Sequence, residues 1–176
     1  MLGIMKNAFL TAIALALATF AVSAADGPKK QPKGSAEFER MKTVVGTWKG
    51  KMDMGQRPVD MTATYRLIAG GSVLEERTFP GTPFEMTTMY YDKGGKLALT
   101  HYCMAGNRPQ MALKKADKNS IDFDFDEACG IDVAKEFHMH ALKIVFNSKN
   151  TITTQCKAVA GGKANEMKPC KLTRVK

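Results

Sequence analysis

Beyond residue 45 the chain is a succession of short segments in which apolar and polar residues alternate, the pattern of half-buried β-strands. The connectors at residues 92–95, 116–119 and 147–150 have the length and composition of hairpin turns. Closing such strands into a barrel leaves no exposed sheet edge. We therefore predict an all-β fold, an antiparallel up-and-down barrel of about ten strands, at residues 45–53, 59–68, 72–79, 85–91, 96–104, 110–115, 120–126, 136–147, 151–159 and 167–175.

A short helix is expected before the first strand. Ser35 has the residue type preferred at a helix N-cap, and acidic residues follow it in the first turn, where they favour the helix dipole. Phe38, Met41 and Val45 fall on one side of this helix. We expect that side to lie against the sheet or to close one end of the barrel.

The N-terminal residues have the pattern of a cleaved export signal. Lys6 provides the positive charge, residues 8–22 are apolar, and Val22-Ser23-Ala24 is a small-residue cleavage site. An apolar run of this length is shorter than the ~20 residues of a membrane span, and no second run follows. We predict a signal peptide at 1–24, a linker at 25–34, a barrel domain at 35–176 with no transmembrane segment, and a periplasmic or secreted protein.

The net charge of +9 does not by itself indicate a nucleic-acid partner. Lysines are scattered along the chain, and the one cluster, Lys29, Lys30 and Lys33, lies in the Pro/Gly-rich linker. No aromatic residues are interleaved with it, as they are in nucleic-acid-binding patches. We interpret the charge as a solvated basic surface and expect no nucleic-acid partner.

The strand at residues 96–104 changes character along its length. Leu97, Leu99, His101 and Cys103 share one face, which is apolar first and polar last. The strand then enters a turn containing Asn107. This change predicts that the strand runs from the packed end of the barrel to the mouth of a cavity.

Other strands supply polar residues to the same predicted interior. His138 and His140 precede an apolar face on residues 136–147, so we expect all three histidines to face inward. A hairpin about Gly70-Gly71 sets Glu76 opposite Tyr65 and turns it inward, where it needs a His or Tyr partner, while Arg66 and Glu75 form an outer ion pair. A turn at 92–95 sets Met86 opposite His101. The predicted ligand-binding residues are Glu76, Met86, His101, Tyr102, Asn107, His138 and His140, although strict alternation turns Tyr102 outward.

Several functions suit inward histidines. The favoured one is a small, partly apolar ligand bound in a cavity with a histidine-lined mouth. The alternatives are a zinc-like site on His101, His138 and His140, haem on one histidine, a Cys103–His nucleophile pair, or a structural domain with a filled interior. The twelve methionines form no dense Met-x-x-Met array and are interpreted as core residues. No metal is favoured, and the sequence indicates no catalytic residue, cofactor or oligomeric state.

The four cysteines permit disulfides in an oxidising compartment. Folding the C-terminal hairpin about Lys163 sets Cys156 opposite Cys170, near the reach of a disulfide that contributes about 3 kcal/mol. A second, less favoured bond joins Cys103 and Cys129.

Short motifs resemble known proteins. Gly46-Thr47-Trp48 after a short helix resembles the Gly-x-Trp opening of lipocalin-like barrels. The runs at 69–76, 79–86 and 99–107, which include Thr-His-Tyr-Cys and Gly-Asn, and His138-Met139-His140 are similar to a bacterial family of exported lipocalin-like (calycin) proteins of unknown function. The resemblance covers about residue 38 to the C-terminus and implies a calycin-type barrel without an established activity or cofactor. At residues 154–156 relatives tend to carry a Trp-containing aromatic strand; Thr-Gln-Cys here favours a local disulfide.

Overall fold

The computed structural model describes residues 33–53, 55 and 57–175. The predicted signal peptide and all but the last two residues of the predicted linker lie outside this part. The described residues form a short helix, α1 (Ala36–Met41), three 3-10 turns, η1 (Lys42–Val44), η2 (Ala69–Gly71) and η3 (Glu127–Cys129), and the strands β1 (Gly46–Asp53), β2 (Pro58–Ile68), β3 (Val73–Thr78), β4 (Met86–Lys93), β5 (Lys96–Tyr102), β6 (Gln110–Ala116), β7 (Ser120–Phe125), β8 (His138–Ser148), β9 (Thr151–Ala160), β10 (Lys163–Glu166) and β11 (Cys170–Arg174).

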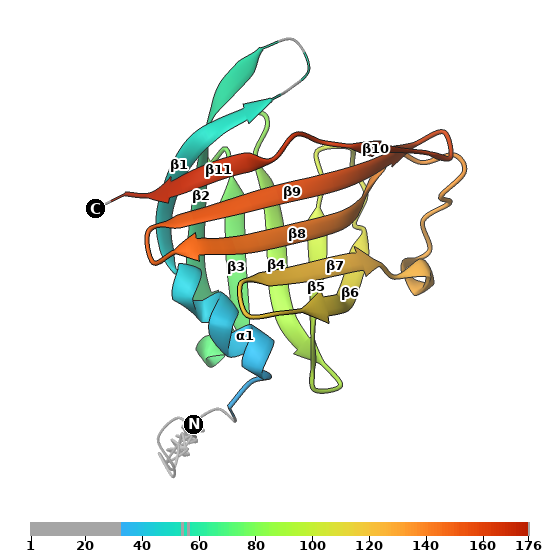
Figure 1. The fold of residues 1–176 in the computed structure, drawn as a ribbon. Helices are drawn as coiled ribbons and strands as arrows, with labels where there is room; N and C mark the ends of the chain where they lie inside the picture. Colours follow the sequence, from blue (N-terminus) through green and yellow to red (C-terminus); the bar gives the residue numbers. More distant parts are fainter. Residues whose placement is uncertain (1–32, 54, 56, 176) are drawn as a thin grey trace, which may run out of the picture. The chain divides into compact units, whose positions relative to one another are not determined.

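The strands close into an antiparallel barrel, which confirms the predicted fold class (Figure 1). From β1 to β9 each strand pairs with the next along the chain, and β11 fits between β9 and β1. Ten strands thus form the closed wall. The short β10 pairs with the far end of β9, beyond the part of β9 that β11 covers, and the sequence predicted only a turn there.

Helix α1 lies across one end of the barrel because its N-terminus is bonded to the β4–β5 hairpin (Figure 1). Ser35 caps the helix by accepting a hydrogen bond from the Phe38 amide, and its own amide and hydroxyl donate to Asp92 at 2.6 and 2.7 Å. Phe38 and Met41 are buried in the barrel core as predicted. The third predicted contact is wrong: η1 tightens the chain after α1, so Val44 is buried and Val45 is exposed.

Val44 and Trp48 are buried at the α1 end of the barrel. The Trp48 indole donates to the Val44 carbonyl at 2.7 Å, and the Arg174 guanidinium lies 4.2 Å from the indole ring. Arg174 also donates to the Thr43 carbonyl at 2.7 Å, which ties the last strand to η1. A cation stacked on a buried ring and bonded to backbone carbonyls stabilises this closure.

Two predicted hairpin registers have different outcomes. Tyr65 pairs with Glu76 and Arg66 with Glu75, as predicted, and Arg66 and Glu75 form an ion pair. The β4–β5 hairpin turns at Gly94-Gly95, which shifts the pairing by two residues from the predicted one. His101 therefore lies opposite Thr88 instead of Met86.

The register of the C-terminal hairpin also differs from the predicted one. The chain turns at Gly161-Gly162, so Cys170 pairs with Thr154, and Cys156 pairs with Leu142 of β8. The two cysteines are diagonal neighbours, a spacing of about 7 Å that exceeds the ~4 Å between Cβ atoms in a disulfide. The predicted opposition is wrong, and all four cysteines, which lie in the described part of the chain, have free thiols. The predicted Cys103–Cys129 bond is likewise not formed.

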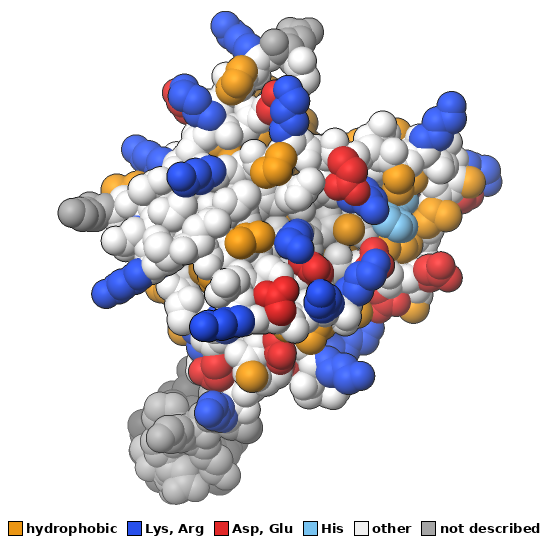
Figure 2. All heavy atoms as spheres, viewed as in Figure 1, with side chains coloured by type: hydrophobic (Ala, Val, Ile, Leu, Met, Phe, Trp, Pro, Cys, Tyr) orange, Lys and Arg blue, Asp and Glu red, His pale blue; other side chains and the backbone are white. Residues whose placement is uncertain are grey.

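Charged side chains of both signs are interspersed on the face shown in Figure 2. Of the described helices, none is long and apolar enough to cross a membrane.

Candidate functional site

The half of the barrel opposite α1 is hollow. Its cavity has a volume of about 190 Å³. Strand β5 runs into it from the packed end: Leu97 and Leu99 are fully buried in the core, and His101 and then Cys103 line the cavity. The lining is mainly thioether and aromatic, and consists of Met52, Met61, Met86, Met104, Met139 and Met167, Phe79, Phe84, Phe137 and Tyr90, the polar residues Glu76, Thr78, Thr88, His101 and Thr154, and Cys103, Leu142, Cys156 and Ala158.

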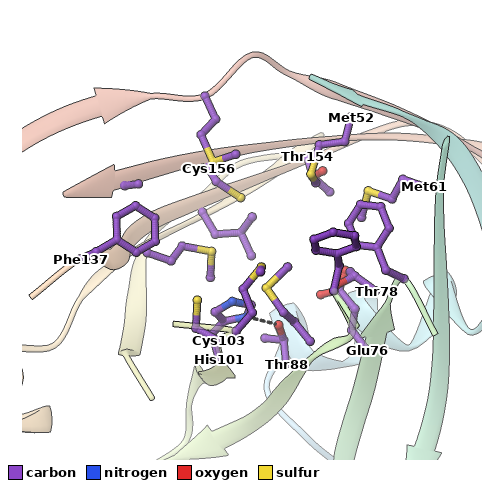
Figure 3. A pocket seen from close by; sticks show the side chains of 18 of the residues that line it. Met52, Met61, Glu76, Thr78, Thr88, His101, Cys103, Phe137, Thr154 and Cys156 are labelled. Carbon is purple, nitrogen blue, oxygen red and sulfur yellow. Dashed lines mark hydrogen bonds between the residues drawn. The ribbon is translucent and has the colours of Figure 1, made fainter. Parts of the chain in front are cut away.

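A row of four polar residues leads into one wall of the cavity, and three of them, Glu76, Thr88 and His101, line it. Tyr65, Glu76, Thr88 and His101 are directly paired residues on four successive strands, β2 to β5. The Tyr65 hydroxyl donates to Glu76 Oε1 at 2.6 Å, and Thr88 Oγ1 lies 2.9 Å from His101 Nδ1. Figure 3 shows Glu76, Thr88 and His101 on one wall, with Thr154 and Cys156 on the opposite wall.

Glu76 is a buried carboxyl held by two phenols. Tyr90 donates to its second oxygen, Oε2, at 2.6 Å. Burial raises the pKa of Glu76, and hydrogen bonds from Tyr65, Tyr90 and Thr88 oppose that rise. Burial, reinforced by the Glu76 charge, raises the pKa of both tyrosines well above the ordinary value, so both remain hydrogen-bond donors.

His101 is a neutral imidazole at neutral pH. Burial lowers its pKa from 6.5 to about 4, and its side chain is bonded to Thr88 through Nδ1. A neutral histidine has one donor nitrogen and one acceptor nitrogen, so His101 brings no charge to the cavity.

Thr78 supplies an unsatisfied polar group. Its Oγ1 is buried and has no hydrogen-bond partner among the described residues, yet the residue lines the cavity beside Glu76 (Figure 3). Leaving a buried hydroxyl unpaired costs about 1–3 kcal/mol. A ligand that bonds this hydroxyl would recover that cost.

His138 and His140, which were predicted to face the cavity, are not among the residues that line it, although His138 is fully buried. His138 pairs with Val159 and Met139 with Ala158, but the next pair joins Ala141 to Lys157 and leaves His140 as a bulge. The extra residue reverses the alternation, so Met139 takes the inward position.

The two displaced histidines form a separate cluster with Phe125. Their rings lie 4.7 and 5.1 Å from the Phe125 ring, and His138 Nε2 is 3.1 Å from His140 Nδ1. The three histidines are therefore not brought together. Among the described residues no group of three or more His, Cys, Asp or Glu side chains is arranged to hold a metal ion.

Of the five remaining predicted site residues, three line the cavity, one supports its mouth and one points away from it. Glu76, Met86 and His101 line the cavity. Tyr102 is 44% exposed and points away from it, as strict alternation requires. Asn107 supports the mouth by donating from Nδ2 to the Phe137 carbonyl at 2.6 Å.

Cys156 faces the cavity as an inert thiol. Burial, and to a smaller extent Glu76 and Cys170, raises its pKa to about 12. A thiol with so high a pKa is not a nucleophile at neutral pH.

The sequence interpretation missed Thr78, Thr88, Tyr90 and Met139 as lining residues. The first three share the inward face of β3 and β4 with Glu76 and Met86, so alternation alone could have found them. Met139 lies next to the β8 bulge, for which the sequence contains no recognised signal.

No family model matches this chain, and no curated protein matches its sequence. Among solved structures, it is similar to a protein with unknown function from the DUF3598 family of Nostoc punctiforme, with a TM-score of 0.52 and 12% identity over 84% of this chain and 53% of that one. The chain thus spans about half the length of that neighbour. At this identity the likeness concerns the fold, and it is consistent with a calycin-like barrel.

Proposed function

We propose that this protein binds a small, largely apolar molecule in the barrel cavity. The observation that carries the proposal is the hollow half of the interior, lined by thioethers and rings and crossed by one row of buried polar groups. Apolar cavities with a few convergent polar groups are the usual form of small-molecule sites. A structural domain has no need of such a space, because burial of side chains in it would stabilise the fold.

The composition of the lining favours a flexible or irregular apolar body. Thioethers are unbranched and polarizable, so they adapt to different shapes. Six methionines from several strands and loops surround the cavity. The ligand's body would contact these side chains, and its polar end would meet Glu76, Thr78 and His101.

Three exposed apolar side chains frame the entrance. Phe84, Met104 and Phe137 are each about half exposed and also line the cavity. They come from the β3–β4, β5–β6 and β7–β8 connections. We assign these connections to ligand entry.

A protein with this site would meet its ligand outside the cytoplasm. The proposal rests on the signal-like pattern of residues 1–24, with Ala24 as the last residue of the signal.

Filling the cavity tests the binding proposal. Ala158 is buried on β9 and lines the cavity, whereas Ala112 on β6 is exposed on the outer face. We expect the neutral dye N-phenyl-1-naphthylamine to fluoresce with the wild-type protein and with Ala112→Phe, and to bind Ala158→Phe at least tenfold more weakly. Equal dye affinity in all three folded proteins contradicts the proposal, as does the absence of dye binding to the wild type.

A further inference from the structure

We infer that the ligand's polar end is cationic, an ammonium group that faces Glu76, and that molecules with a carboxylate at that end are excluded. The inference rests on the proposed binding function and specifies the chemical class of its ligand.

The cavity lining carries no permanent positive charge: of the described residues that line it, none is Lys or Arg. His101 is neutral at physiological pH because it is buried. Among the described lining residues, Glu76 is therefore the one carboxyl, and none of the others is a side-chain cation that could balance it.

Glu76 is hydrogen-bonded through both of its carboxyl oxygens. Its two oxygens each accept a phenol hydrogen bond at 2.6 Å, within the range of charge-assisted O–H···O⁻ bonds. Two donors directed at two different oxygens suit an ionised carboxylate, which accepts on both oxygens. An ionised carboxylate accepts about four hydrogen bonds in all, so these phenols leave acceptor capacity for a ligand.

Burial of a negative charge on Glu76 has a cost in free energy. A carboxylate without a cation is unfavourable in an apolar interior, and its hydrogen bonds offset only part of that cost. A ligand ammonium would provide the missing opposite charge in a low-dielectric site, where the attraction is strong. A ligand carboxylate would instead add a second negative charge beside the first.

Aromatic rings in the same lining favour the same sign of charge. Tyr90, whose hydroxyl bonds Glu76, and Phe79 and Phe84 line the cavity. The faces of such rings attract cations and not anions. Thr78 lies two residues from Glu76 on β3, and its hydroxyl, which has no partner among the described residues, can accept a hydrogen bond from the ammonium group.

A series of ligands with one chain length tests the inference. Octylammonium, octanol and octanoate differ only at the polar end, and each is titrated at pH 7.5 to displace N-phenyl-1-naphthylamine. We expect octylammonium to bind at least tenfold more tightly than octanol, and octanoate to bind most weakly. Octanoate binding as tightly as octylammonium, or octanol matching octylammonium, overturns the inference.

Matched carboxyl variants locate the preference. Glu76→Gln should bring octylammonium to within threefold of octanol while octanol and dye binding persist. Glu75→Gln changes the neighbouring carboxyl, which forms an ion pair with Arg66, and should keep the wild-type order. Retention of the full preference in Glu76→Gln also overturns the inference. If Glu76→Gln does not fold, the order in which the three octyl compounds bind the wild-type protein still supports or overturns the inference. Failure of the dye and of all three octyl compounds to bind would instead count against the proposed binding function itself.

Discussion

At the scale of single residues, the cavity wall is a short chain of polar groups with opposite pH behaviour. His101 must stay neutral to remain buried against Thr88, so burial lowers its pKa. Burial raises the pKa of Glu76, although hydrogen bonds oppose the effect. Because each pKa changes on folding, the free energy of unfolding depends on pH, and the His101 and Glu76 contributions to it change in opposite directions as pH falls.

The His101 shift predicts a loss of stability in mild acid. A group whose pKa is lowered on folding contributes stability that is present above its unfolded pKa, 6.5, and is lost as pH falls towards about 4. At about 1.36 kcal/mol for each pH unit between these values, the contribution is roughly 3 kcal/mol. Urea unfolding of the wild type between pH 7.5 and 4.5 should show this loss, and His101→Gln should lack it.

The comparison with His101→Gln isolates the histidine because Glu76 is present in both proteins. The contribution of Glu76 has the other sign: it is present below its unfolded pKa and is lost as pH rises through its folded pKa. If both proteins lose the same stability between pH 6.5 and 4.5, the histidine is not the cause.

At the scale of elements, the attachment of α1 depends on one cap. Ser35 both accepts from the Phe38 amide and bonds Asp92 on the β4–β5 hairpin, so it joins the helix to the barrel. The helix is too short to be stable by itself and needs this tertiary contact.

Loss of the cap should destabilise the whole domain. We expect Ser35→Ala to lower the free energy of unfolding by about 1 kcal/mol, the usual effect of removing a helix N-cap. Chemical denaturation monitored by Trp48 fluorescence measures it, since Trp48 lies in the core at the same end. Ser148→Ala is the control: it removes an exposed 3.2 Å hydrogen bond from the Asn150 amide within the β8–β9 turn and should change stability by less than about 0.5 kcal/mol. Equal stability of the wild type and Ser35→Ala would refute the role of the cap.

Strand positions and strand registers differ in how far the sequence specifies them. Alternation located the ten strands of the barrel wall, because each has one face in the core. The predicted β2–β3 register was correct because the chain turns in η2, which contains the Gly70-Gly71 pair on which the prediction was based. The predicted β4–β5 register was wrong by two residues. All four residues 92–95 suit a turn, and the position at which the chain turns among them depends on how the barrel closes.

At the scale of the whole molecule, the barrel has a packed end and a hollow end. Helix α1, Trp48 and Arg174 close the packed end, and the connections bearing Phe84, Met104 and Phe137 surround the hollow end. This asymmetry suits a protein that takes up a ligand through one opening.

The N-terminal pattern predicts how the whole chain is processed. Expressed with its full sequence in a Gram-negative host, the protein should be recovered from the periplasm with Ala25 as its first residue, because the small-residue site ends at Ala24. Intact-protein mass spectrometry of the periplasmic fraction measures this. Replacement of Ala24 by a bulky residue should leave the longer precursor, and recovery of an uncleaved wild-type chain in the cytoplasm would contradict the prediction.

The sequence by itself determined the fold class, the capped helix, the inward position of Glu76 and the change of β5 from core to cavity. These features follow from local patterns of alternation and capping, which short-range geometry controls. Only the tertiary structure decided the pairing of His101 with Thr88, the separation of Cys156 from Cys170, and the displacement of His138 and His140 by a bulge. The physical reason is that closing the barrel fixes every strand against two neighbours at once, and a shift of one or two residues in any strand changes which side chains meet.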